Sequence, residues 1–135
     1  MKRFTSPKYS TAAFNVALLV LRIGMGALMI PHGYNKLMNF MQYKKDFMNF
    51  MGIGSTTTLV LVIFAEFFCA SLLVLGLFTR FAAIPLVIGM SVALFVAHNA
   101  EVFGDGKVAE LFLTGFIAIL LVGPGRISVD GMISK

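Results

Sequence analysis

Six of the ionisable residues within, or at the ends of, the strongly apolar stretches of this 135-residue sequence could do chemistry together. They are Arg22, His32, Lys36, Glu66, His98 and Glu110. Guanidinium, ammonium and imidazole groups donate hydrogen bonds to an electron-rich ligand, and a carboxylate can take up or release protons when burial and a nearby cation tune its pKa. Such groups in one apolar environment predict a polar pocket that binds a small molecule and moves protons.

The composition is that of a membrane protein. Hydrophobic residues make up 59% of the chain and charged residues 13%, and the mean hydropathy is +0.91, whereas soluble domains are roughly half apolar and a quarter charged. A chain of 135 residues predicts one domain, residues 1–135. The net charge of +5 reflects basic residues in short loops, which set membrane topology. We therefore expect the lipid bilayer as a partner, and no nucleic acid.

Four apolar stretches predict four membrane-spanning helices, at about residues 12–38, 57–78, 79–99 and 107–123, since a helix needs about 20 residues to cross the hydrocarbon. Residues 38–57, MNFMQYKKDFMNFMGIGSTT, are too charged to span and too rich in Phe to leave the interface. Met41, Lys44 and Met48 there predict a short amphipathic helix at the outer surface. The predicted fold is all-α, a transmembrane four-helix bundle with this interfacial helix between the first two spans.

The distribution of basic residues predicts the orientation. With both termini on one side, that side carries Lys2, Arg3, Lys8, Arg80, Arg126 and Lys135, against Lys36, Lys44, Lys45 and Lys107 opposite. Short loops rich in Lys and Arg stay in the cytoplasm, so we expect a multi-pass inner (plasma) membrane protein with cytoplasmic termini. A cleaved signal peptide is not expected, because Arg22 interrupts the apolar region and no convincing cleavage site follows.

Arg22 and Glu66 are predicted to meet. Counting about 1.5 Å per residue from the helix ends places both near the middle of the bilayer. An ionised side chain there costs roughly 2.5 to 3.5 kcal/mol, so the two should pair, with the planar guanidinium holding the carboxylate. Such a pair can also serve only to fix helix register.

The remaining polar residues are predicted to lie in the outer half of the bundle. A stripe at steps of three and four along the first helix holds Arg22, Met25, Gly26, Met29, His32, Gly33 and Lys36. His98 ends the third helix and Glu110 opens the fourth. Each alone has an ordinary explanation, as a snorkelling, capping or interfacial side chain. Together they favour a functional pocket in the outer half.

These motifs resemble the DoxX family of small membrane proteins over about residues 14 to 130. The similar segments are LRIGMGALMIPHGYNKL, AEFFCASLLVLGLFTRFAA and KVAELFLTGFIAILLVGPGRISVD. By position, the family's characteristic polar sites fall on Arg22, His32, Lys36, Glu66, His98 and Glu110. The resemblance implies a link to thiosulfate:quinone oxidoreductase, to quinone or electrophile resistance, or to membrane complexes that handle oxidative stress.

The favoured function is a quinone-associated redox protein, or a subunit of a membrane oxidoreductase complex. Headgroup ligands would be Arg22, His32, Lys36 and Met29, with His98 as a further donor, while Glu66, Glu110 and His98 would act in catalysis by passing protons. Met25, Phe67 and Phe68 could add to the ring and tail site. Cys69 is the single cysteine, and no iron–sulfur, haem or metal motif occurs, so electrons must come from a soluble or membrane redox partner or a diffusible reductant. Under this favoured function, quinone is the one cofactor that we expect.

Two alternatives stay open. The chain could be a small proton-coupled transporter or channel that acts as a homo-oligomer and uses Glu66, or a scaffold without catalytic activity. Enzyme activity itself is left open by the sequence. If the protein is part of an enzyme, we expect a subunit of a quinone-dependent oxidoreductase.

Overall fold

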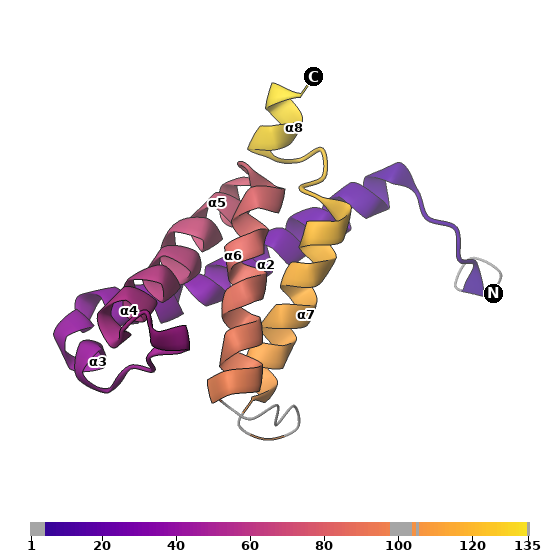
Figure 1. The fold of residues 1–135 in the computed structure, drawn as a ribbon. Coiled ribbons are helices and arrows are strands. Elements are labelled where there is room, and N and C mark those ends of the chain that lie inside the picture. The colour runs from indigo at the N-terminus through magenta and orange to yellow at the C-terminus, as the bar shows by residue number, and fades with distance from the viewer. Residues whose placement is uncertain (1–4, 98–103, 105, 135) are drawn as a thin grey trace.

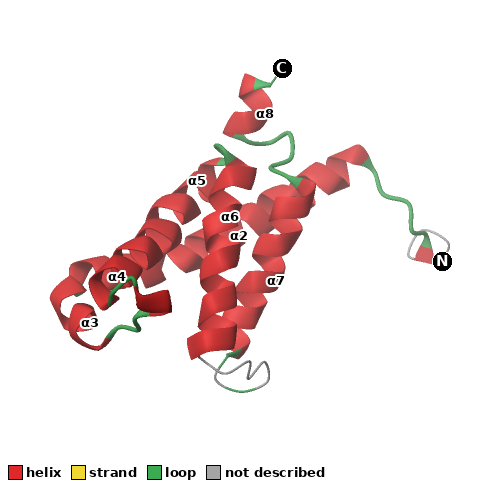
Figure 2. Cartoon of the chain, viewed as in Figure 1, coloured by secondary structure: helices red, strands yellow, loops and turns green. Residues whose placement is uncertain are grey.

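The sequence folds into helices joined by short connections in a computed structural model that describes residues 5–97, 104 and 106–134. The elements used below are α2 (Thr11–Met38), α3 (Phe40–Asp46), η1 (Phe50–Gly52), α4 (Ser55–Ile63), η2 (Phe64–Cys69), α5 (Ala70–Leu75), α6 (Thr79–Val92), η3 (Ala93–Ala97), α7 (Lys107–Val122) and α8 (Val129–Ile133). Within the described ranges there is no β-strand (Figure 2). The all-α prediction is therefore confirmed for these residues.

Two helical stretches have the length and hydropathy of a membrane span. They are α2 and the continuous stretch Ser55–Leu75, which α4, η2 and α5 form together. The third stretch, Thr79–Phe95, is apolar but shorter, and α7 has 16 residues, below the roughly 20 that a perpendicular crossing requires. Membrane crossing by these two shorter helices stays a prediction.

The four longer helical stretches pack around a common apolar core. Figure 1 shows α6 and α7 side by side, crossing α2, while α4 and α5 run along α2. The largest fully buried apolar side chains are Met29, Leu59, Leu73, Leu86, Leu94, Phe116 and Ile119. On the outside, Val20, Phe68 and Leu121 are each more than half exposed. Extended exposed apolar surface of this kind is expected where a protein faces lipid.

Gly33 brings α2 close to the segment that carries Glu66. A Cβ atom at Gly33 would lie 2.6 Å from the backbone nitrogen of Phe67, and one at Gly26 would lie 2.8 Å from the carbonyl oxygen of Ala70. Backbone atoms cannot move aside as a flexible side chain can. The two glycines therefore fix both the distance and the lengthwise position of α2 against η2 and α5.

Replacing Gly33 with alanine is expected to lower the free energy of unfolding by about 1 to 3 kcal/mol, the usual effect of overpacking a tight contact. Gly24→Ala is the matched control on the same helix, because nothing lies within 4 Å of a Cβ at Gly24. The measurement is the thermal midpoint of the purified protein in detergent. Equal midpoints for the two variants would contradict the close approach.

Candidate functional site

A cavity of about 190 Å³ opens between α2, η2, the α6–η3 stretch and α7. Its lining residues are Met29, His32, Lys36, Glu66, Met90, Ala93, Val108, Ala109 and Phe112. We call this cavity the ion-pair pocket. It brings together Met29, His32, Lys36 and Glu66, four of the residues that sequence analysis selected.

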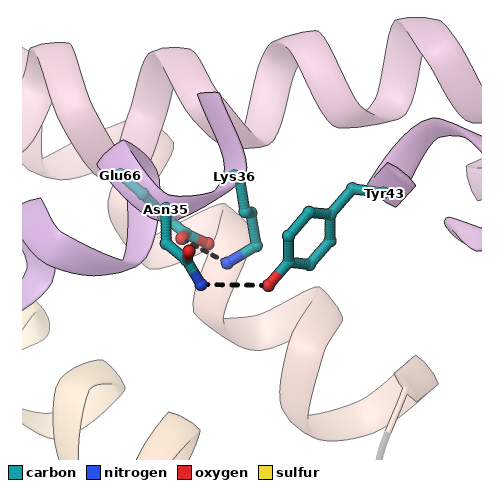
Figure 3. Close-up of polar contacts among 4 residues, drawn as sticks. All are labelled: Asn35, Lys36, Tyr43 and Glu66. Atoms are coloured by element: carbon teal, nitrogen blue, oxygen red, sulfur yellow. Dashed lines mark hydrogen bonds and ion pairs between the residues drawn. The ribbon is translucent and has the colours of Figure 1, made fainter. Parts of the chain in front are cut away.

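Lys36 and Glu66 form an ion pair in this pocket. Lys36 Nζ lies 2.7 Å from Glu66 Oε1 (Figure 3). The Lys36 side chain is 18% exposed and the Glu66 side chain 8%. Lys36 lies almost one turn beyond Gly33, which abuts the Glu66 backbone. Helical side chains lean toward the N-terminus, so the Lys36 side chain reaches back to that level. In the described part of the chain Glu66 is the one hydrogen-bond partner of the Lys36 ammonium. The ammonium has three N–H groups, so two of them remain for a ligand.

Two segments of π-helix contribute to the wall of the pocket. Glu66 lies within η2, and Ala93 is the first residue of η3. Well under 1% of residues in proteins adopt this conformation, and it occurs frequently at functional sites. A π-turn adds a residue to the helix and changes the direction in which nearby side chains point. Its presence in two neighbouring helices at one cavity marks this level of the fold as a candidate site.

The rest of the pocket is mostly apolar. The His32 ring meets Phe112 edge to face, with ring centroids 5.7 Å apart and an interplanar angle of 86°. Met29 is 1% exposed and forms part of the inner wall, whereas His32 is exposed. A ligand that fits this surface needs an apolar ring, and a hydrogen-bond acceptor where it reaches Lys36.

The predicted pairing of Arg22 with Glu66 is wrong. Arg22 Nη1 donates to the carbonyl oxygen of Pro124 at 2.7 Å, and Nη2 donates to that of Ile127 at 2.9 Å. Gly33, which marks the level of Glu66, lies eleven residues farther along α2, a rise of about 16 Å. Arg22 is instead level with Gly76, just past the end of α5. It is buried but does not line the ion-pair pocket.

Arg22 belongs to a network that ties the C-terminal segment to the helix ends. Asp130 Oδ1 and Oδ2 accept hydrogen bonds from the backbone N–H groups of Phe78 and Thr79, at 2.8 and 2.9 Å. The Asp130 N–H donates to the carbonyl oxygen of Gly76 at 2.8 Å. Arg22 holds the same segment through its bonds to the carbonyl oxygens of Pro124 and Ile127. Its guanidinium keeps its charge in proteins, so we assign it a structural role.

Other sequence-selected residues lie elsewhere. Glu110 Oε1 accepts a hydrogen bond from Thr114 on the same helix and does not line the pocket. His98 falls outside the described residues. Phe67 stacks on Tyr34 and Phe68 on Phe64, and Met25 fills the space at Gly115. None of these three apolar side chains lines the pocket, contrary to expectation.

The predicted site residues do not include the pocket residues of α6, η3 and α7. Ala109, Phe112 and Phe116 recur at steps of three and four and are all buried, a pattern that identifies the inward face of α7. This spacing can be read from the sequence, but it does not distinguish residues that line a pocket from residues of the ordinary apolar core. The position of Ala93 at the start of a π-helix has no comparable signal in the sequence.

Comparison with known proteins adds a family and two relatives. The DoxX family model matches residues 17–99. The chain is 31% identical over 134 residues to the uncharacterized membrane protein Rv3486 of Mycobacterium tuberculosis, covering 88% of this chain and 82% of that protein. It is 28% identical over 127 residues to the inner membrane protein YqjF of Escherichia coli, covering 90% of this chain and 95% of that protein. No solved structure matches the chain significantly.

Proposed function

The chain belongs to the DoxX family of membrane proteins, and on that premise we propose that it binds a quinone headgroup in the ion-pair pocket as part of a membrane oxidoreductase system. The observation that carries the proposal is a Lys36–Glu66 pair at 2.7 Å in an otherwise mostly apolar pocket. An apolar cavity of about 150 Å³ holds a benzene ring, so about 190 Å³ suits a single six-membered ring with small substituents.

The chemistry of the pocket supports this ligand class. A quinone supplies two carbonyl oxygens that accept hydrogen bonds, and it takes up electrons and protons there. Lys36 can donate from its free N–H groups, and His32, beside Phe112, adds a second donor. Glu66 holds the positive charge of Lys36 in place and can hold a proton next to the bound ring. Electrons come from a redox partner protein or a diffusible reductant.

The proposed membrane arrangement follows from the same helices. All four long helical stretches cross the bilayer as a bundle, and α3 lies at the outer interface. Both termini lie in the cytoplasm, which places Lys36, Glu66 and the pocket in the outer half of the inner membrane. The two short helices, Thr79–Phe95 and α7, require a locally thin bilayer or help from flanking residues.

The two alternatives make different predictions. A proton-coupled transporter that uses Glu66 predicts substrate-driven proton movement in liposomes, which quinone binding alone does not. The scaffold alternative predicts no bound ligand, and the next experiment separates it from quinone binding.

The protein purified from its native membrane is expected to carry quinone, detected by mass spectrometry of the lipid extract at a quinone-to-phospholipid ratio above that of the bulk membrane. Ala109→Leu, at a buried residue of the pocket wall, should fill the cavity and remove the enrichment. Ala27→Leu is the matched control, because Ala27 is exposed on α2 away from the pocket. Wild-type protein without enrichment, or enrichment that survives Ala109→Leu, would count against the proposal.

A further inference from the structure

A second, more polar hollow lies where the end of α2 meets α3. It has a volume of about 490 Å³ and is lined by Asn35, Asn39, Gln42, Tyr43 and Phe47. Three of these side chains are carboxamides and one is a phenol, so the wall offers uncharged hydrogen-bond donors and acceptors. Polar, roomy sites of this chemistry hold water. We call it the amide hollow.

A chain of hydrogen bonds crosses the amide hollow and joins its two helices. Asn39 Nδ2 donates to Asn35 Oδ1 at 2.9 Å. Asn35 Nδ2 in turn donates to the Tyr43 hydroxyl at 3.1 Å, the bond that Figure 3 draws. The Tyr43 hydroxyl accepts in this bond, so its own hydrogen is available to a water molecule. In the described residues, this is the side-chain hydrogen bond that ties α3 to α2.

The amide hollow adjoins the ion pair. Asn35 and Lys36 are consecutive on α2, and Asn39 follows the last residue of that helix. In Figure 3 the Asn35 and Lys36 side chains extend to the same side of α2, where Asn35 meets Tyr43 and Lys36 meets Glu66. Lys36 keeps 18% of its side chain exposed. The lining of the amide hollow therefore begins one residue along α2 from the Lys36–Glu66 pair.

We propose that the amide hollow is the aqueous entrance through which Lys36 and Glu66 exchange protons with the solution, and that the Tyr43–Asn35 hydrogen bond holds α3 closed over it. The ion-pair pocket then admits the lipophilic ligand from one side, and protons arrive from the other. This division deepens the proposed function and rests on it for its biological meaning. The access route itself is a property of the protein that can be measured without a quinone.

The test labels Lys36 with a water-soluble sulfonated succinimidyl ester in the full-length protein, and peptide mass spectrometry compares Lys36 with the exposed Lys44. Tyr43→Phe is expected to raise the Lys36 to Lys44 labelling ratio by about fivefold, the factor that one modest hydrogen bond contributes to a closed state. Tyr34→Phe is the matched control, because Tyr34 stacks on Phe67 outside the hollow. It should leave the ratio unchanged.

Ala109→Leu identifies the route, because it fills the ion-pair pocket but not the amide hollow. If reagent enters through the hollow, this variant labels as the wild type does. An unchanged ratio in Tyr43→Phe, an equal rise in Tyr34→Phe, or loss of labelling in Ala109→Leu would each overturn the inference. Quinone enrichment is measured separately, so failure of the entrance and failure of quinone binding are distinguishable.

Discussion

Replacing Arg22 with methionine is expected to lower the free energy of unfolding by about 3 kcal/mol, because it removes two hydrogen bonds from a charged donor, each worth roughly 1.5 to 3 kcal/mol. The bonds go to the carbonyl oxygens of Pro124 and Ile127, which lose this partner in the variant. Among the residues that the structure describes, Arg22 Nε is buried without a hydrogen-bond partner, and removing that atom offsets part of the loss. The measurement is the thermal or denaturant midpoint in detergent.

Arg80→Met is the matched control for this change. Arg80 is exposed, and its one side-chain hydrogen bond to a described residue runs from Nη2 to the carbonyl oxygen of Val122 at 3.1 Å, so its loss should shift the midpoint far less. Because Arg22 does not line the ion-pair pocket, the protein that remains folded should keep its bound quinone. If Arg22→Met lost its quinone while its stability was unchanged, Arg22 would have to bind the ligand, and the structural role assigned to it would be wrong.

Removing one partner of the Lys36–Glu66 pair is expected to destabilise the protein strongly. Lys36→Met leaves the Glu66 carboxylate, 8% exposed, without its cation, and breaking a buried pair in this way costs on the order of 3 kcal/mol. The double variant Lys36→Met and Glu66→Leu should recover most of that loss, because apolar side chains of similar size replace buried pairs with little change in stability. Thermal midpoints of both variants give the comparison.

Lys44→Met supplies the control for the single change, because Lys44 is exposed on α3 and should tolerate replacement. If the double variant were as unstable as Lys36→Met, the pair would be contributing through packing or a further contact. If Lys36→Met were as stable as the wild type, the two side chains would not be paired in the protein. Either result would remove the electrostatic basis of the pocket.

Much of the site could be predicted from one helix alone. Spacing of three and four along α2 places Met29, His32 and Lys36 on one face, because the helical period is a property of the local chain. The apolar composition likewise indicates a membrane protein without reference to any contact. Predictions that depend on a single period or on a total composition need no knowledge of how helices meet.

The error over Arg22 shows what a single helix cannot provide. Counting the depth of Arg22 and Glu66 from the helix ends assumes that neighbouring helices begin and end level with one another. The lengthwise position is set instead by the contacts of Gly26 with Ala70 and of Gly33 with Phe67. The partners of Arg22 lie more than 100 residues away in the sequence, and no periodic pattern links them.

The most direct test of the account compares quinone bound per protein in the wild type and in the Lys36→Met and Glu66→Leu double variant, with thermal midpoints measured on the same samples. We expect the double variant to keep a midpoint close to that of the wild type and to lose the quinone, because no donor then faces the ring from position 36. Equal quinone content in the two folded proteins would show that ligand binding does not depend on the ion pair, and would contradict the central claim.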